Sequence, residues 1–453
     1  MKLVYDVKDK PKFGHLIVLA FQQLLAILAA TIVVPVIVNG NAGLAGGEFE
    51  MSQSAALFGA GVGTIVYLLF TKFKSPVFLG SSFAFLGSMT AAFAGATTAQ
   101  AGYVGLIIGA VLAGLVYVVI AIAVKVAGVK WIDKLMPKQV IGPTVAIIGL
   151  SLAGAAISDL QVGKHYVDGA SSANPLIAIL VGIITLFVVM ICSVYGKKTA
   201  KLIPFIIGIL AGYAVASCFT VIGNATGNDA LKLIDFSVFS GMKIFSVPAF
   251  TFLTAKDGLK AIDGTYIASV AMAYVPVAFV VFAEHIADHK NISSIIEKDL
   301  LEDPGLHRTL LGDGVGSMVG AFFGGCPNTT YGESIGCVAI TGNASVVTIL
   351  CTSVICILMS FLDPFVVFLS SIPNCVMGGV CIALYGFIAV SGLKMVQKVD
   401  LEQNKNLFVV STILITGIGG LALTFGKITI TSIATALILG IIANLVLNRK
   451  KAA

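Results

Sequence analysis

The stretches SPVFLGSSFAFLG at residues 75–87 and GCPNTTYGESIGCV at residues 325–338 decide the fold. Each is an apolar segment interrupted by a proline, Pro76 in the first and Pro327 in the second. A bilayer tolerates irregular backbone only where it is buried in protein or lines a cavity. Two such breaks, one in each half of an apolar chain, predict a binding site near the centre of a membrane.

Proline also predicts the local structure of both stretches. It disfavours helix in the residue before it and removes a backbone donor, so we predict extended backbone at residues 77–79 and 328–330. Two short extended pieces satisfy their backbone groups by pairing with each other. Short helices then begin near Ser82 and Tyr331, and their unpaired N–H groups and positive dipole ends face the same point.

The composition identifies the class of protein. The chain has 453 residues, of which 58% are hydrophobic and 11% are charged, whereas soluble domains carry about 25% charged residues. Its mean hydropathy is +1.02. These values predict an all-α polytopic membrane protein that crosses the lipid bilayer many times.

Apolar segments recur along the whole chain. A span needs about 20 apolar residues, and we predict 14 transmembrane segments, of which the third and the tenth are short and contain the proline breaks. They begin near His15, Ser52, Phe78, Gly102, Val140, Pro175, Leu202, Thr265, Thr309, Glu333, Ser345, Pro364, Leu407 and Thr429.

The basic residues predict the orientation. With both termini in the cytoplasm, only six of the 28 lysines and arginines face outward, as the positive-inside rule requires. These six are Lys164, Lys232, Lys243, Lys256, Lys260 and Lys427. The net charge of +6 follows from this bias and indicates no nucleic-acid partner. We therefore expect a multi-pass protein of the cell membrane.

Cysteine and glycine have packing roles in this interpretation. The eight cysteines lie in or beside apolar segments without a C-x-x-C pair, so we expect reduced thiols, no metal site and no cofactor. Gly312, Gly316 and Gly320 are four residues apart, a spacing that lets helix backbones approach closely.

Two pairs of similar segments link the halves of the chain. One joins the stretches after Pro76 and Pro327, and the other joins PKQVIG at 137–142 to PNCVMG at 373–378. A long outer segment, from about residue 223 to residue 264, separates two sets of seven spans. Because seven is odd, the second set enters the membrane from the opposite side, which predicts a seven-plus-seven inverted repeat typical of transporters.

Four acidic residues are candidate site residues. Glu333 lies in the first turn of a short helix and either caps it or binds a ligand; the cost of burying a carboxylate favours binding. Glu284 and Asp288 are one helical turn apart and share a face, either within the membrane or at the wet end of a span. Asp313, in a glycine-rich span, is either a proton-linked group or a polar anchor to a neighbouring helix.

The same residues predict the chemistry of the ligand. Acids without partnering cations in a membrane are suited to proton coupling, because low-dielectric surroundings favour the neutral form. No lysine or arginine lies in the central part of a predicted span, which argues against a strong anion. A neutral molecule with N–H donors and carbonyl acceptors fits better, and a nucleobase such as uracil has both.

An enzyme is the alternative from another class. His285, Asp288 and His289 form H-x-x-D-H, close to the inverted zinc-protease pattern H-x-x-E-H. Two histidines four residues apart can bind one metal ion. The pattern has Asp in place of Glu, and no third ligand is identifiable, so we expect no catalytic residues and treat an intramembrane metalloenzyme as the remote alternative.

Longer stretches resemble a known family, the nucleobase–ascorbate transporters (nucleobase:cation symporters), and in particular their bacterial uracil branch. The resemblance covers nearly the whole chain. It is carried by KDLLEDPGLHRTLLGDG (298–314), NTTYGESIGCVAIT (328–341), FLGSSFAF (78–85), IGLSLAG (148–154), and IPNCVMGG with LYGFIAVSG (372–392).

The resemblance implies an architecture. It implies a core domain made of residues 1–135 and 265–362, and a gate domain made of residues 136–223 and 363–453. An extracellular connection at residues 224–264 joins the two halves. In this family the substrate lies between the domains, members of the uracil branch are proton symporters, and contacts between gate domains form homodimers.

The resemblance also implies site roles. Glu284 and Glu333 accept hydrogen bonds from two edges of the base, the backbone at Phe83 and Gly332 faces it, and Tyr331 lies beside it. These roles imply a symporter that imports uracil with a proton by alternating access.

Departures from the family pattern leave the substrate and the proton-bearing residue open. The usual Gln-His pair of the first span is Gln22-Gln23, and the usual Asn after Glu333 is Ser334. Asp288 and Asp313, our candidates for proton coupling, are more typical of the purine branch. A purine or xanthine symporter is therefore the near alternative, whereas the two site acids argue against an anion transporter of the sulfate-permease type.

Overall fold

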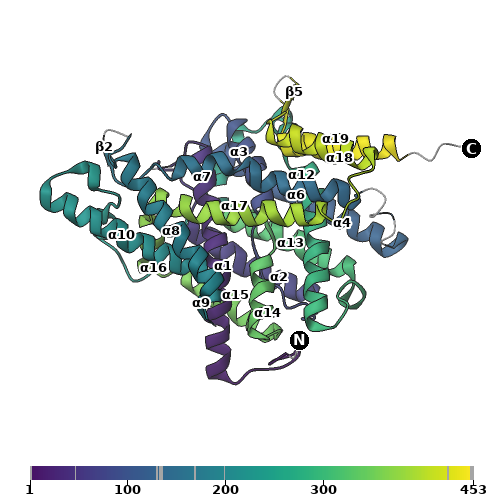
Figure 1. The fold of residues 1–453 in the computed structure, drawn as a ribbon, viewed down its shortest axis with the longest axis horizontal. Helices are drawn as coiled ribbons and strands as arrows, with labels where there is room; N and C mark the ends of the chain where they lie inside the picture. Colours follow the sequence, from purple (N-terminus) through teal and green to yellow (C-terminus); the bar gives the residue numbers. More distant parts are fainter. Residues whose placement is uncertain are drawn as a thin grey trace, which may run out of the picture.

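The computed structural model describes residues 3–45, 47–128, 131, 136–167, 170–197, 199–425 and 428–448. Helices dominate this structure (Figure 1). Within the described residues, eight helical segments are long and apolar enough to cross a membrane. They are Phe13–Asn41 (α1), Gln53–Phe70 (α2), Ala99–Ala127 (α4), Lys138–Asp159 (α6 and α7), Pro175–Tyr195 (α8), Pro204–Thr226 (α10), Gly264–Ile296 (α12) and Asn374–Val396 (α17).

Shorter helices lie between and after these segments. They are Leu86–Ala94 (α3), Thr199–Leu202 (α9), Thr251–Ala255 (α11), Leu306–Gly324 (α13), Gly332–Thr341 (α14), Val346–Met359 (α15), Asp363–Ser371 (α16), Asn404–Ile418 (α18) and Ser432–Leu447 (α19). The apolar run after Pro364 is divided into α16 and α17. The division falls at Ile372, which is extended, because Pro373 disfavours helix in the residue before it.

Two short strands from distant parts of the chain pair in the interior. Leu79–Ser81 (β1) follows Pro76, Asn328–Thr330 (β4) follows Pro327, and the two are antiparallel with Gly80 opposite Thr329. Helical turns resume directly afterwards, at Phe83–Phe85 (η1) before α3 and at Gly332 in α14. Two hairpins elsewhere are Tyr166–Val167 (β2) with Ala170–Ser171 (β3) and Leu423–Phe425 (β5) with Ile428–Ile430 (β6).

Hydrogen bonds with neighbouring helices hold this strand pair in place. Thr64 of α2 accepts a hydrogen bond from the backbone N–H of Leu79 (2.9 Å), and the Asn328 amide donates to the carbonyl of Gly59 (3.0 Å). Ser334 of α14 accepts from the backbone N–H of Phe78 (3.1 Å). Buried backbone groups outside a regular ladder are costly unless they are paired, so these contacts fix the position of both strands.

Glycine allows the closest helix contacts. A Cβ atom at Gly59 of α2 would lie 2.5 Å from the carbonyl oxygen of Gly320 in α13, and one at Gly149 of α6 would lie 2.3 Å from that of Tyr385 in α17. The close approach that we predicted for the α13 glycines is confirmed. These contacts join α13 to α2 and α17 to α6, the two helix pairs with the most extensive packing.

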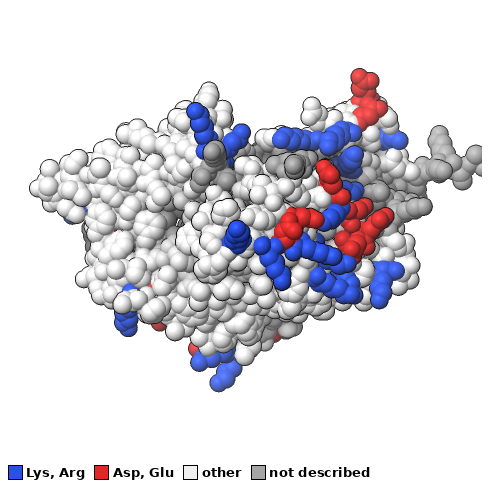
Figure 2. Space-filling model, turned by 90° about the horizontal axis from the view of Figure 1, so that it is seen from below, with Lys and Arg blue, Asp and Glu red and all other residues white. Residues whose placement is uncertain are grey.

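The surface separates charged from apolar areas. Lysine, arginine and acidic side chains gather over one part of the face in Figure 2, while much of the rest of that face is uncharged. Ion pairs formed by charged surface residues include Lys74 with Asp303 and Lys298 with Asp6. Helix α8, by contrast, exposes large apolar side chains such as Leu176, Phe187 and Val194, as expected of a helix that faces lipid.

Candidate substrate-binding site

A cavity of about 400 Å³ lies among the helices, a volume within the usual range for small-molecule sites. Its lining comes from distant parts of the chain: α1, η1, α6, α9, α10, α12, β4, α14 and α17. Polar groups are supplied mainly by α12, β4 and the start of α14, and apolar groups mainly by α6, α10 and α17. The cavity thus has one polar side and one apolar side.

Helix α12 contributes two carboxylates to the cavity. Glu284 and Asp288 both line it and are half-buried, one helical turn apart, as their spacing predicts. Asp288 Oδ2 accepts a hydrogen bond from Thr330 Oγ1 of β4 at 2.7 Å. This contact attaches α12 to the strand pair, so the strand pair helps to orient Asp288 in the cavity.

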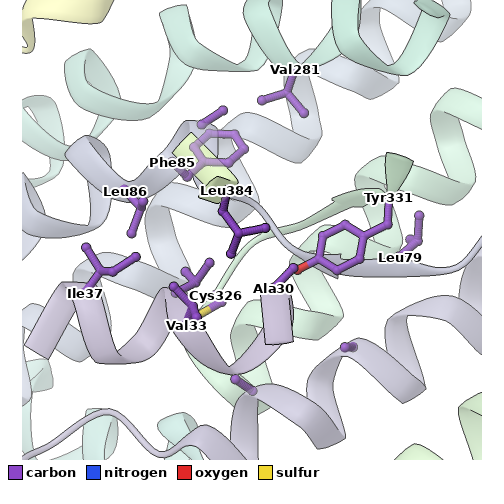
Figure 3. Close-up of a cluster of buried hydrophobic side chains, with 14 of the residues drawn as sticks. Ala30, Val33, Ile37, Leu79, Phe85, Leu86, Val281, Cys326, Tyr331 and Leu384 are labelled. Atoms are coloured by element: carbon purple, nitrogen blue, oxygen red, sulfur yellow. The ribbon is translucent and has the colours of Figure 1, made fainter. Parts of the chain in front are cut away.

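The chain from β4 into α14 contributes the opposite part of the polar side. Tyr331, Gly332 and Glu333 all line the cavity. Glu333 lies in the first turn of α14, where the first N–H groups have no partner within the helix and attract negative charge. Tyr331 is buried and donates to the carbonyl of Ser81 at 2.8 Å. In Figure 3 its ring lies beside Leu79 and points toward α1 near Ala30.

The first proline-containing stretch contributes an aromatic residue to the cavity. Phe83 of η1 lines the cavity, and its ring contacts Tyr385 of α17 edge to face, with centroids 6.2 Å apart. Leu384 and Phe387 of α17 also line the cavity. The carboxylates therefore share the cavity with apolar and aromatic side chains.

Asp313 lies elsewhere. It belongs to α13, is 1% exposed, and bonds through Oδ2 to His285 Nδ1 at 2.7 Å. The structure therefore brings Glu284, Asp288, Glu333, Phe83, Tyr331 and Gly332 together at the cavity. Asp313 instead lines a separate space of about 10 Å³, which shares no lining residue with the large cavity.

The H-x-x-D-H residues are hydrogen-bonded in different directions. His285 bonds to Asp313 and to Thr309 (3.0 Å), whereas His289 bonds through Nδ1 to the carbonyl of His285 (2.8 Å) and through Nε2 to Tyr67 (2.7 Å). Asp288 instead faces the cavity. All four ring nitrogens have protein partners, so this geometry gives the metalloenzyme alternative no support.

Several lining residues were not predicted from the sequence. Thr329 and Thr330 stand directly before Tyr331, and their place in a predicted extended stretch was the one available signal. Lys201 also lines the cavity and is exposed. Nothing in its sequence context, a basic loop at the end of an apolar segment, distinguishes it from other lysines.

Two positions that depart from the family pattern contact each other. Gln23 of α1 donates through Nε2 to Ser334 Oγ at 2.6 Å, and both residues are buried. Ser334 thus accepts from both Gln23 and the backbone of Phe78. These two hydrogen bonds connect α1 and the segment before β1 to α14 at Ser334, the residue that follows Glu333.

Comparison with known proteins identifies the family. A family model described as Permease family (Xan_ur_permease) matches residues 14–425. The chain belongs to this family. With eight apolar helices among its described residues, it is a multi-pass membrane protein, and its family indicates a transporter.

Relatives and a solved structure extend the comparison. The chain is 39% identical to the uracil permease of Bacillus caldolyticus, covering 98% of this chain and 95% of the relative. It is 35% identical to the uracil permease of Bacillus subtilis (strain 168), with coverages of 99% and 96%. The transmembrane domain of a cyanobacterium bicarbonate transporter, BicA, has a similar fold, with a TM-score of 0.59 at 14% identity, covering 97% of this chain and 100% of that domain.

Proposed function

We propose that the protein is a nucleobase transporter that imports uracil together with a proton across the cell membrane. The observation that carries the proposal is the convergence of Glu284, Asp288 and Glu333 on one cavity that also contains the start of α14. The uracil permease names of relatives at 39% and 35% identity support the choice of substrate.

The binding chemistry follows from the two kinds of group in the cavity. Uracil carries ring N–H donors, which the carboxylates of Glu284 and Glu333 accept. Its carbonyl oxygens accept from the backbone N–H groups at Phe83 and Gly332, and Tyr331 lies beside the ring. Hydrogen bonds to charged groups contribute about 1.5–3 kcal/mol each, so these two carboxylates account for most of the specificity.

The proton has a candidate carrier in the same cavity. Asp288 lines it and contacts Thr330 of the strand pair. A carboxyl group that faces both the substrate and the cavity is placed to gain a proton on one side of the membrane and release it on the other. We propose Asp288 as the coupling residue.

Alternating access is proposed from the composition of the cavity walls. Residues in the proposed core domain (1–135 and 265–362) supply most of the polar groups, whereas the gate domain (136–223 and 363–453) supplies most of the apolar wall through α6, α10 and α17. Movement of one domain against the other exposes the cavity to either side. Lys201 lines the cavity and is exposed, which supports an opening toward the lysine-rich cytoplasmic side.

The proposed architecture has 14 spans in a seven-plus-seven inverted repeat, with both termini in the cytoplasm. The antiparallel pairing of β1 with β4 supports it, because these strands occupy corresponding places in the two halves. The packing of α6 against α17 supports it as well, because these helices begin at the second pair of similar segments, residues 137–142 and 373–378. By analogy with the family, we propose a homodimer formed through the gate domains.

The test is uptake of labelled uracil by cells that lack their own uracil transporter. We expect accumulation that a protonophore abolishes and that persists without sodium; accumulation that needs sodium and resists a protonophore would replace the proton by sodium. Excess unlabelled uracil should compete better than xanthine, hypoxanthine or sulfate. Stronger competition by xanthine would assign the purine alternative.

A matched pair of variants tests the site itself. Glu333→Gln keeps the size of the side chain but replaces a charged acceptor by a neutral one, so we expect uptake to fall by at least about tenfold. Glu302→Gln, at an exposed position outside the cavity, is the control and should leave uptake unchanged. Near-normal uptake by well-expressed Glu333→Gln would remove Glu333 from the site.

A further inference from the structure

The Asp313–His285 pair is a second buried acidic site, separate from the cavity. Asp313 and His285 are 1% and 0% exposed, and Asp313 Oδ2 lies 2.7 Å from His285 Nδ1. The other ring nitrogen, Nε2, lies 3.0 Å from Thr309 Oγ1, and that hydroxyl donates to the carbonyl of Leu306 at 3.1 Å. His285 of α12 therefore contacts α13 at two points, Asp313 and Thr309.

Counting hydrogens along this chain of contacts locates a proton. We assign the single hydroxyl hydrogen of Thr309 to the Leu306 carbonyl, which can only accept; Thr309 then accepts from His285, and a hydrogen lies on Nε2. A neutral His285 then presents a bare Nδ1 to Asp313, and a hydrogen bond at 2.7 Å requires the carboxyl to carry the proton. If the proton moves to Nδ1, the result is an ion pair. Both arrangements hold one proton and have no net charge.

Loss of that proton is strongly disfavoured by the surroundings. It would require Thr309 to turn its hydrogen away from Leu306. It would also leave a buried carboxylate with a single hydrogen bond, because Asp313 Oδ1 has no hydrogen-bond partner among the described residues. The space beside Asp313 is lined by Phe85, Ala113, Gly114, Tyr117, Val281, Ser317 and Asn328, which include no cationic side chain.

The groups packed around His285 offer no compensating charge either. The ring of His289 stacks on it from one turn further along α12, with centroids 4.0 Å apart, and the ring of Tyr117 from α4 meets it edge to face. The acids of its own helix, Glu284 and Asp288, face the large cavity. A negative charge on Asp313 would be repelled by the charges of Glu284 and Asp288 and would not be stabilised by a cation.

We propose that Asp313 and His285 hold one shared proton throughout the transport cycle and act as positioning residues for α12. The proposal rests on the proposed function and assigns the coupled proton to the cavity acids, Asp288 first. Successive residues on a helix differ by about 100° in direction, so fixing His285 against α13 turns Glu284 and Asp288 toward the cavity.

Replacement of Asp313 tests this assignment. Asp313→Asn has the same shape, and its amide N–H donates to Nδ1 of a neutral His285, so the contact survives without a titratable group. We expect uracil uptake and the accumulation ratio to stay within about twofold of the unaltered protein, with the same pH profile. Asp313→Leu has a similar size but no donor, so we expect at least a fivefold loss of uptake.

Asp288→Asn is the comparison that separates positioning from coupling. We expect it to abolish accumulation against a gradient while uracil still binds to the purified protein. If Asp313→Asn instead abolishes accumulation and retains binding, Asp313 carries the coupled proton and the proposal is overturned. If the unaltered protein shows no proton-driven accumulation, the proposed function fails, while the binding comparison of Asp313→Asn with Asp313→Leu still tests the positioning role.

A measurement on the unaltered protein tests the proposal even if Asp313→Asn folds poorly. The chain has only five histidines, so the ring signals of ¹⁵N-histidine-labelled protein are few, and His285→Gln identifies those of His285. We expect the His285 nitrogens to show no titration from about pH 5 to pH 8, the range in which ordinary histidines titrate. A titration within that range would overturn the proposal.

Discussion

Replacement of Gly80 by alanine tests how the strand pair supports the site. Gly80 is the central residue of β1, and a Cβ atom there would lie 2.4 Å from two ring carbons of Tyr331 and 2.8 Å from its hydroxyl oxygen. Tyr331 is 3% exposed, and its hydroxyl donates to the carbonyl of Ser81. The ring has to move, and it loses this hydrogen bond when it does.

The cost follows from these contacts. Overpacking a well-filled interior costs about 1–3 kcal/mol, and the lost hydrogen bond adds about 1 kcal/mol. The sum of about 2–4 kcal/mol corresponds to a factor of roughly 30 to 700 in the equilibrium constant between the intact site and the site with a displaced Tyr331. We expect Gly80→Ala to lower the thermal midpoint in detergent by several degrees and to reduce uracil uptake by at least 30-fold.

The controls isolate the clash with Tyr331. Gly87→Ala, in α3, places a Cβ atom with no neighbour within 4 Å, so stability and uptake should not fall. Gly80→Ala should be less destabilising in a Tyr331→Ala background, because the clashing ring is absent. Wild-type stability and uptake for Gly80→Ala would refute the reasoning.

Two further predictions concern single contacts. Thr330→Val keeps the side-chain shape but removes the donor to Asp288; we expect about a fivefold to tenfold rise in the KM for uracil, and an unchanged KM would contradict the orienting role of Thr330. Lys298→Met removes the half-exposed partner of Asp6, whose hydrogen bond lowers the pKa of Asp6 below 3.8. This hydrogen bond stabilises only the ionised form of Asp6, so we expect Lys298→Met to lower the free energy of unfolding by at most about 1 kcal/mol at neutral pH, and by less as the pH falls below 3.8. Thermal midpoints of both proteins across pH measure the difference. A difference of equal size at all pH values would point to packing instead.

The sequence by itself determined the class of protein and the local backbone. Hydropathy reports burial in lipid directly, and proline acts on the residues beside it, so the apolar helices and the strand β4 followed from short stretches. The strand β1 lies at residues 79–81, two residues beyond the extended stretch predicted at 77–79. The spacing of Glu284 and Asp288 placed them on one face for the same reason. These properties depend on residues close together in the sequence, from directly adjacent residues to the about 20 residues of one span.

Only the tertiary structure decided which acids share a cavity. Sequence left Asp313 open between a proton-linked group and an anchor, and the contact with His285, 28 residues away, decided its place. The link from Thr330 to Asp288 and the presence of Lys201 in the lining had no local signal. The physical reason is that the direction a buried side chain faces depends on the neighbouring helix, and that neighbour is set by packing across the whole chain.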